Sequence, residues 1–219
     1  SLLLISIALP AAAAQTDTSH DAPIFRGNPD RAGAMPGPDP NQQIATLWVV
    51  LTLDILHASP AANGVIFVGG WDGSLYAIDP DTGEQRWAFQ AGSSIRTSPV
   101  VVDGVVYVSD WDNRDGDNLY AIDASTGEQR WAFQAGSMIW SSPAVVDGVV
   151  YVGSMDANLH ALDAATGEQR WVFPTGAGIV SAPVVVDGVI YAGSGTDHLY
   201  AIDVATGQQR WALPVEPSV

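Results

Sequence analysis

One stretch of this sequence holds enough oxygen donors to ligate a divalent cation. Between Asp110 and Asn118 most residues carry a carboxylate or an amide, the hard oxygen ligands that Ca²⁺ prefers. The candidate calcium ligands are Asp110, Asp112, Asn113, Asp115 and Asp117. Their order does not follow the D-x-[DN]-x-[DN]-G register of calcium loops, because Trp111 stands where the first Asp should be. A solvated acidic loop is therefore the alternative interpretation.

The remaining residue patterns predict no catalytic machinery. The four histidines are not spaced as metal ligands, and the sequence lacks the G-x-S-x-G, H-E-x-x-H and phosphate-cradling glycine motifs. We therefore predict no catalytic residue and no cofactor-binding residue in this chain. We also predict no metal ligand beyond the calcium candidates.

The charge balance excludes two classes of partner. The sequence has 24 acidic residues against eight basic residues, all of them arginine, and its formal net charge is −16 at pH 7. Binding to nucleic acid and binding to anionic lipid both depend on cationic side chains, so neither partner is expected. An acidic surface instead favours divalent cations and basic partners. The sequence has no cysteine, so it contains no disulfide.

The chain is organised by a repeated segment of the form LYAIDASTGEQRWAF. Its four near-copies begin at Leu75, Leu119, Leu159 and Leu199, at intervals of 44, 40 and 40 residues. Each copy contains Ala-x-Asp, three residues, Gly, three residues and Trp. These positions are Ala77, Asp79, Gly83, Trp87, Ala121, Asp123, Gly127, Trp131, Ala161, Asp163, Gly167, Trp171, Ala201, Asp203, Gly207 and Trp211. A fixed period of this length indicates a repeat architecture.

Each copy reads as a β-hairpin that delivers one Trp to the same place. LYAID alternates as a strand does, Asp-x-x-Thr-Gly is turn chemistry, and the chain then reverses into QRWAF. Two further valine-rich strands precede it, joined by Asn63-Gly64 in the first repeat and by Asp-Gly in the later ones. Such dipeptides favour a type I′ turn. Four antiparallel strands every ~40–45 residues predict the blade of a β-propeller. His160 replaces the Tyr of its copy, so we expect a packed core residue there.

The Ala-x-Asp-x-x-x-Gly-x-x-x-Trp unit resembles the tryptophan-docking motif of the PQQ-like (quinoprotein-type) β-propellers. The resemblance covers about residues 44–213 and implies an all-β fold in which each Trp packs against the next blade's motif. The expected blades are about 58–90, 97–134, 141–173 and 181–213. Rings of this family usually have seven or eight blades, so four blades imply part of a ring, either a fragment or a half-ring that forms a homodimer.

The segments outside the repeats have separate predicted roles. Residues 1–14 read as the remnant of a secretory signal peptide, because an apolar run precedes small residues. Residues 15–46 read as an extended Pro/Gly-rich leader, and 47–53 as an N-terminal strand that carries another docking residue, Trp48. The repeats occupy 47–213 and a tail follows. The expected location is therefore periplasmic or extracellular, with no integral membrane segment after signal removal.

The four repeats differ from one another mainly on one face. The turns after the first and third strands hardly vary, while the loops after the second and fourth strands do. A specific binding site should lie where the sequence varies, although these loops could also have drifted without function. The predicted binding face comprises Trp71, Arg96, Trp111, Trp140 and His198.

These observations lead to three hypotheses about function. The first is an exported, non-catalytic scaffold that binds envelope proteins or a small ligand, similar to the propeller subunit of the outer-membrane protein assembly machinery. The second is a fragment of a PQQ- and calcium-dependent quinoprotein dehydrogenase, whose cofactors the resemblance alone implies. The third is a ligand-sensing propeller domain of a larger receptor.

Overall fold

The computed structural model describes residues 4–6, 49–51, 61–62, 64–111 and 118–215, with side chains placed from residue 64 onward. The predicted leader 15–46, Trp48 and the calcium candidates other than Asp110 lie outside these residues. All regular secondary structure in the described part is β-strand. No helix among the described residues is long and apolar enough to cross a membrane.

Four antiparallel sheets, one for each predicted blade, follow one another along the described chain. Blade 1 contains β3 (Ala61–Ala62), β4 (Ile66–Gly69), β5 (Ser74–Ile78) and β6 (Gln85–Gln90). Blade 2 contains β8 (Val100–Val102), β9 (Val105–Trp111), β10 (Asn118–Asp123) and β11 (Gln129–Gln134), with β7 (Ser94–Ile95) paired to the end of β9. Blade 3 contains β12 (Ala144–Val146), β13 (Val149–Gly153), β14 (Asn158–Asp163) and β15 (Gln169–Pro174). Blade 4 contains β16 (Val184–Val186), β17 (Val189–Ser194), β18 (His198–Asp203) and β19 (Gln209–Pro214).

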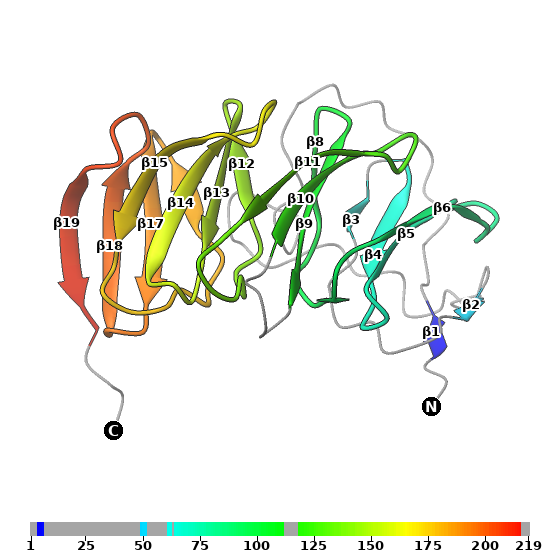
Figure 1. Ribbon diagram of the computed structural model, residues 1–219, viewed down its shortest axis with the longest axis horizontal. Coiled ribbons are helices and arrows are strands. Elements are labelled where there is room, and N and C mark those ends of the chain that lie inside the picture. The colour runs from blue at the N-terminus through cyan, green and yellow to red at the C-terminus, as the bar shows by residue number, and fades with distance from the viewer. Residues whose placement is uncertain (1–3, 7–48, 52–60, 63, 112–117, 216–219) are drawn as a thin grey trace, which may run out of the picture.

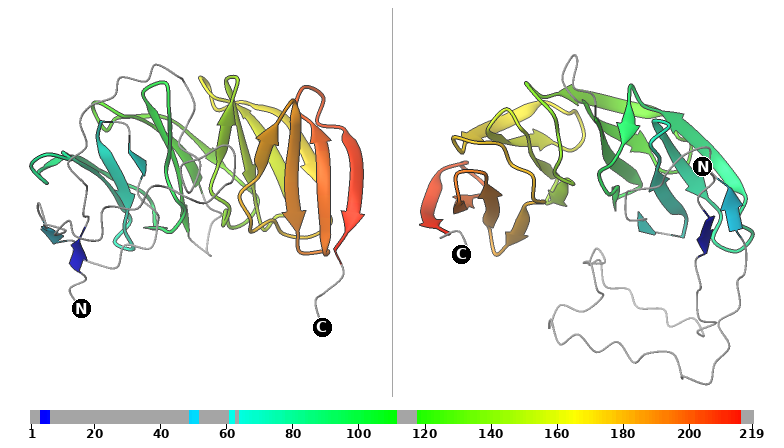
Figure 2. Two further views of the ribbon diagram at one scale, coloured as in Figure 1. Left: turned by 180° about the vertical axis from the view of Figure 1, so that it is seen from behind. Right: turned by 90° about the horizontal axis from the view of Figure 1, so that it is seen from below.

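The blades stand side by side in chain order along an arc, with blade 1 and blade 4 at its two ends (Figures 1 and 2). A separate ladder pairs β1 (Leu4–Ser6) antiparallel with β2 (Val49–Leu51), which lies within the predicted N-terminal strand 47–53. The prediction of an all-β fold with four propeller blades is confirmed.

The Asp-Gly turns have the predicted type I′ geometry. Both central residues of such a turn need positive φ, and Asp103 and Gly104 have φ of 49° and 73°. The equivalent turns in blades 3 and 4 repeat this pair of values closely, at Asp147-Gly148 and Asp187-Gly188. These turns fix the register of the first two strands, so each blade begins in the same way.

In the second blade, successive side chains of one strand point to opposite faces of the sheet and join different buried clusters. In β10, Leu119 and Ala121 belong to a buried cluster shared with blade 3. The side chains between them, Tyr120 and Ile122, belong to a buried cluster shared with blade 1. An inner blade is therefore buried on both faces, which explains why its strands are apolar at nearly every position.

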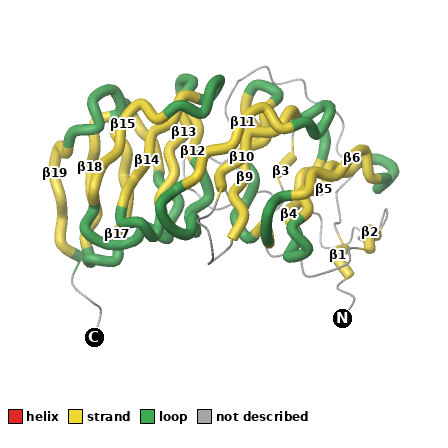
Figure 3. The backbone as a smooth tube through the Cα atoms, in the orientation of Figure 1, coloured by secondary structure: helices red, strands yellow, loops and turns green. Residues whose placement is uncertain are grey.

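The connections between strands gather at two opposite edges of the row of sheets (Figure 3). We call the edge formed by the turns after the first and third strands of each blade the turn face. The edge formed by the loops after the second and fourth strands is the loop face. The repeated motif supplies the turn face, and the variable loops supply the loop face.

Candidate functional site

Three of the docking tryptophans, Trp87, Trp131 and Trp171, each join their blade to the next one. The Trp131 indole Nε1 donates a hydrogen bond of 3.0 Å to the carbonyl oxygen of Ala164 in blade 3. Its ring lies so close to Gly167 that a Cβ there would stand 2.7 Å from Trp131 Cδ2. Trp87 and Trp171 repeat this arrangement, with Nε1 bonds of 3.1 Å to blades 2 and 4. The motif glycine is therefore needed for the close approach of the ring as well as for its positive φ.

Trp211 in blade 4 has no such partner among the described residues and is 43% exposed. The flank of blade 4 around it also exposes Val184, Val186 and Leu213. On blade 2, Trp131 occupies the same position in its repeat, and there blade 3 covers the ring. The same motif position is therefore buried where a following blade is described and exposed where none is.

The motif Asp organises the turn that receives the ring. In blade 3, Asp163 Oδ1 accepts hydrogen bonds from the backbone N–H groups of Ala165 and Thr166, at 2.9 and 3.0 Å. Its Oδ2 accepts a bond of 2.7 Å from Arg170. The sequence predicted a turn at this aspartate but the arginine was missed, although an Arg follows the motif Asp by seven residues in every copy.

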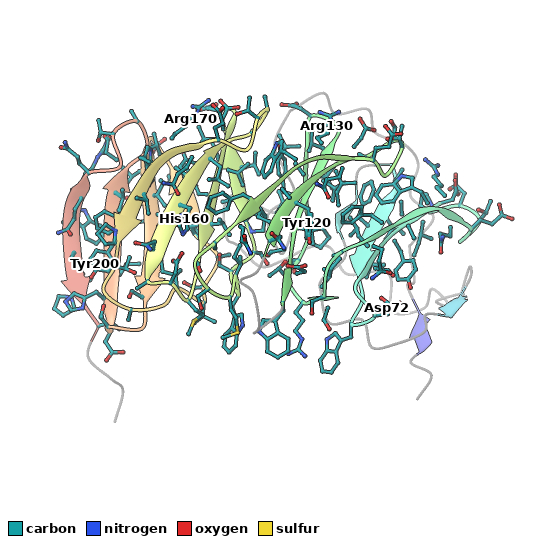
Figure 4. The ribbon with its side chains drawn as sticks, in the orientation of Figure 1. Asp72, Tyr120, Arg130, His160, Arg170 and Tyr200 are labelled. Atoms are coloured by element: carbon teal, nitrogen blue, oxygen red, sulfur yellow. The ribbon has the colours of Figure 1, made fainter. Side chains whose placement is uncertain are left out.

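A β-bulge places this arginine beside the aspartate. Ala161 pairs with Trp171 and the next residue, Leu162, pairs with Gln169, so Arg170 is the extra residue of the ladder. A bulge re-aims the side chain of the inserted residue. The same bulge and the same 2.7 Å ion pair occur in all four blades, and Arg130 and Arg170 accordingly lie along one edge of the molecule (Figure 4).

We expect acid to weaken these turns. The hydrogen bond from Arg170 and those from the backbone lower the pKa of Asp163 from 3.8 to about 2. The ionised carboxylate therefore stabilises the fold above about pH 4, and this contribution is lost as the pH falls toward 2. The melting temperature of the Asp163→Asn variant should be lower at pH 6 and should fall less between pH 4 and pH 2. Thermal unfolding followed by circular dichroism measures both, and equal falls would contradict the assignment.

On the loop face, Arg96 is stacked between two tryptophan rings. Its guanidinium carbon lies 4.3 Å from the Trp71 ring centroid and 3.5 Å from the Trp111 centroid. Trp71 comes from blade 1, Trp111 ends the second strand of blade 2, and Arg96 lies in the loop between the blades. The Arg96 Nε atom is buried and has no hydrogen-bond partner among the described residues.

The stack continues across blade 3 as a row of apolar side chains. Trp111 Nε1 donates to Met138 Sδ at 3.1 Å, and the Met155 backbone N–H donates to the Met138 carbonyl at 2.8 Å. The Met155 side chain then crosses Gly178, where a Cβ would stand 2.6 Å from its sulfur. We call the side chains that occupy these equivalent loop positions the loop-face row: Trp71, Arg96, Trp111, Trp140, Met155 and Val180.

The structure thus brings together part of the predicted binding face. Trp71, Arg96 and Trp111 are in direct contact, and Trp140 is exposed two residues from Met138. His198 does not join them, because its contacts with Thr196 and Tyr200 lie within blade 4. Met155 and Val180 were missed, although their repeat positions match those of Trp71 and Arg96.

Beneath the loop face, two acidic residues form hydrogen bonds to side chains and backbone groups of their own blades. Asp110 is 1% exposed and accepts hydrogen bonds of 2.8 Å from the Asn118 N–H and 2.9 Å from the Tyr120 hydroxyl. Burial raises the pKa of Asp110, and burial also raises the pKa of Tyr120 to about 12. His160 pairs with Asp156 at 2.9 Å in blade 3 and is buried, as expected from its Tyr position.

The described residues do not supply a calcium donor set. No group of three or more His, Asp or Glu side chains among them could hold a metal ion. Asp110, the one calcium candidate that the structure describes, uses both carboxylate oxygens in the internal bonds above. Whether the acidic loop itself binds calcium stays a prediction.

A family model and several solved structures are similar to this chain. A family model described as outer membrane protein assembly factor BamB matches residues 41–140 and 117–218. BamB from Moraxella catarrhalis has a TM-score of 0.67 at 24% identity, covering 77% of this chain and 56% of that one. Quinohemoprotein alcohol dehydrogenase from Comamonas testosteroni has a TM-score of 0.64 at 19% identity, covering 73% and 35%.

One curated sequence relative shares a short segment. Lupanine 17-hydroxylase [cytochrome c] from a Pseudomonas species is 45% identical over 49 residues, which are 22% of this chain and 7% of that protein. The chain spans about half the length of the BamB structure and a smaller part of both enzymes. The likeness to the solved structures shows the fold, while the family model covers most of the repeats. The chain therefore belongs to the PQQ-like propeller-repeat family whose model is described as outer membrane protein assembly factor BamB.

Proposed function

We propose that this protein is an exported, non-catalytic scaffold of the cell envelope whose loop-face row binds a segment of another protein. The observation that carries the proposal is the stacked Arg96. The other arginines of the described residues each pair with the Asp of their own repeat at 2.7 Å. Arg96 forms no ion pair with a described residue and lies instead among aromatic rings on the variable face.

The stacked guanidinium of Arg96 is suited to form hydrogen bonds with a carboxylate of a partner. Two rings lie against the guanidinium, so a carboxylate partner would meet the in-plane N–H groups at its outer end. Charge-assisted bonds of this kind are stronger than neutral ones. Trp140, Met155 and Val180 are exposed along the same row and offer apolar contact beside the charge. Trp and Arg are also the residues that most often dominate binding energy at protein interfaces.

This site fits a protein segment that carries a carboxylate between apolar side chains. The family description, an outer membrane protein assembly factor, and the predicted signal peptide support an envelope partner. The predicted homodimer of half-rings would use a different surface, the exposed flank of blade 4 around Trp211. The two surfaces are independent, so partner binding and self-association can be measured separately.

The charge of the partner provides a sharp test. The net charge of −16 favours a basic peptide, whereas the local site favours an acidic one. At 0.15 M salt the screening length is about 8 Å, so the local contact should decide. We expect an acetylated Leu-Glu-Leu-Glu-Leu peptide to bind more tightly than the same peptide with Gln or Lys in place of Glu. Fluorescence anisotropy measures the three affinities. Arg96→Gln should lower the affinity for the acidic peptide by roughly ten-fold or more, since hydrogen bonds to charged groups contribute about 1.5–3 kcal/mol.

Arg170→Gln is the matched control because it makes the same change in net charge on the turn face. It should leave the peptide affinity within about two-fold, since that site lies far from the screened contact. Equal losses in the two variants would show that overall charge, and not the Arg96 site, determines binding. Tighter binding of the Lys peptide would contradict the proposal directly.

A quinoprotein dehydrogenase is the second candidate, favoured by the local identity to lupanine 17-hydroxylase and by the fold of the alcohol dehydrogenases. The described residues do not fit calcium, because no acidic or histidine cluster among them could hold it. We therefore assign no step to a bound quinone. Calorimetric titration of PQQ with and without Ca²⁺ separates the candidates, and a saturable Ca²⁺-dependent heat would favour the enzyme.

A further inference from the structure

The junction between blades 3 and 4 contains a pocket that opens at the turn face. Its volume is about 490 Å³, within the range of roughly 300–1,000 Å³ typical of small-molecule sites. Val146, Val185 and Trp171 form apolar walls, and the A–B turn residues Asp147 and Asp187 contribute to the lining from the two blades. The pocket is remote from the loop-face row and does not depend on the function proposed above.

One residue distinguishes this junction from the one before it. Between blades 2 and 3, the Tyr107 hydroxyl donates a hydrogen bond of 3.2 Å to the Ala164 carbonyl. The residue equivalent to Ala164 in blade 4 is the larger, β-branched Val204, which lines the pocket and lies beside Gly188. We attribute the pocket at the second junction to this side chain.

The hydroxyl of Tyr151 lacks the bond that its equivalent forms at the preceding junction. Tyr151 is equivalent to Tyr107 and is 2% exposed, yet its hydroxyl has no hydrogen-bond partner among the described residues. A hydroxyl at a pocket wall that bonds to no described residue is available to a ligand as a hydrogen-bond partner. Burial also raises the pKa of Tyr151.

The unpaired charges of the pocket are negative. The guanidinium of Arg170 is already held by Asp163 at 2.7 Å. Asp147 and Asp187 are exposed at the pocket and form no ion pair with a described residue. A ligand that matches this lining needs a positive group for the carboxylates and an apolar body for the valine and Trp171 walls.

We propose that the pocket between blades 3 and 4 binds a small organic cation, an alkylammonium with a compact apolar body. The ammonium lies at Asp147 and Asp187, and the body fills the space between Val146, Val185 and Trp171. The Tyr151 oxygen accepts a hydrogen bond from the ammonium. No covalent step is involved.

Nuclear magnetic resonance titration of the full chain with cyclohexylammonium tests this proposal, read at the amides of Gly188 and Ala205. We expect saturable shifts at both amides. Cyclohexanol should bind about ten-fold or more weakly, because it lacks the charge-assisted bonds. The double variant Asp147→Asn with Asp187→Asn should lower the affinity for cyclohexylammonium by a similar factor. Equal affinity for the alcohol, or saturation by Ca²⁺ at lower concentration, would overturn the organic-cation assignment.

A reciprocal pair of variants tests the origin of the pocket. Val204→Ala restores the residue that blade 3 has at this position, so it should fold normally, close the gap and abolish the shifts. Ala164→Val should open a second saturable site at the junction between blades 2 and 3, read at the amides of Gly148 and Ala165. Unchanged binding in Val204→Ala would refute the role of that side chain.

Discussion

Replacing Trp131 by Ala should lower the free energy of unfolding by about 3–5 kcal/mol, the range typical of large aromatic residues removed from a core. The ring is 8% exposed, lies against Gly167, and bonds to the Ala164 carbonyl at 3.0 Å. It also contacts Tyr107, with ring centroids 5.8 Å apart. Truncation removes these contacts together, so blades 2 and 3 should separate more easily. Chemical denaturation followed by circular dichroism measures the loss.

Trp211→Ala is the matched control because it deletes the same side chain at the same motif position. Trp211 is 43% exposed and lacks a following blade among the described residues. Its replacement should cost about 1 kcal/mol or less, as at most surface positions. Similar losses for the two variants would show that docking onto the next blade does not stabilise the fold.

Gly167→Ala should be nearly as damaging as the loss of the ring itself. Its φ of 76° lies in the left-handed region, where an L-residue costs about 1–2 kcal/mol. The new Cβ would also stand 2.7 Å from Trp131 Cδ2, so the ring must move off its docking surface. Overpacking of this kind adds about 1–3 kcal/mol, and we expect a total loss of about 3 kcal/mol or more. Thermal and chemical unfolding of the variant measure this total.

Gly148→Ala separates the two contributions in the same blade. Gly148 has a similar φ of 71°, but nothing lies within 4 Å of a Cβ built there. It should therefore lose only the backbone cost of about 1–2 kcal/mol. If Gly148→Ala and Gly167→Ala were equally destabilised, the contact with Trp131 would contribute nothing.

The fold could be predicted from the sequence because every relevant signal is local and repeated. The Asp-Gly turns, the alternation of LYAID and the spacing to Trp131 each lie within a few residues of one another and recur at a fixed period. The hairpins therefore follow from short-range rules. The bulge at Arg170 could have been found too, since an Arg recurs seven residues after each motif Asp.

The candidate sites were harder to predict because they join loops that are distant in sequence. Trp71 and Arg96 come from different loops, and nothing in their separate sequences states that they stack. Met155 and Val180 become noticeable only when the repeats are aligned by position. The pocket beside Tyr151 joins residues of two blades, and we attribute it to one change in side-chain size, at Val204. Asp110 was predicted as a calcium candidate for its oxygens, yet burial and Tyr120 give it an internal role.

The central claim is that the Arg96 guanidinium on the loop face binds a carboxylate of a protein partner. A double-mutant cycle tests it most directly, combining Arg96→Gln with the Glu-to-Gln change in the Leu-Glu-Leu-Glu-Leu peptide. If the two groups are in contact, their binding energies should be coupled by about 1.5–3 kcal/mol, the contribution of a hydrogen bond to a charged group. Additive effects, with no coupling beyond about 0.3–0.5 kcal/mol, would contradict the claim.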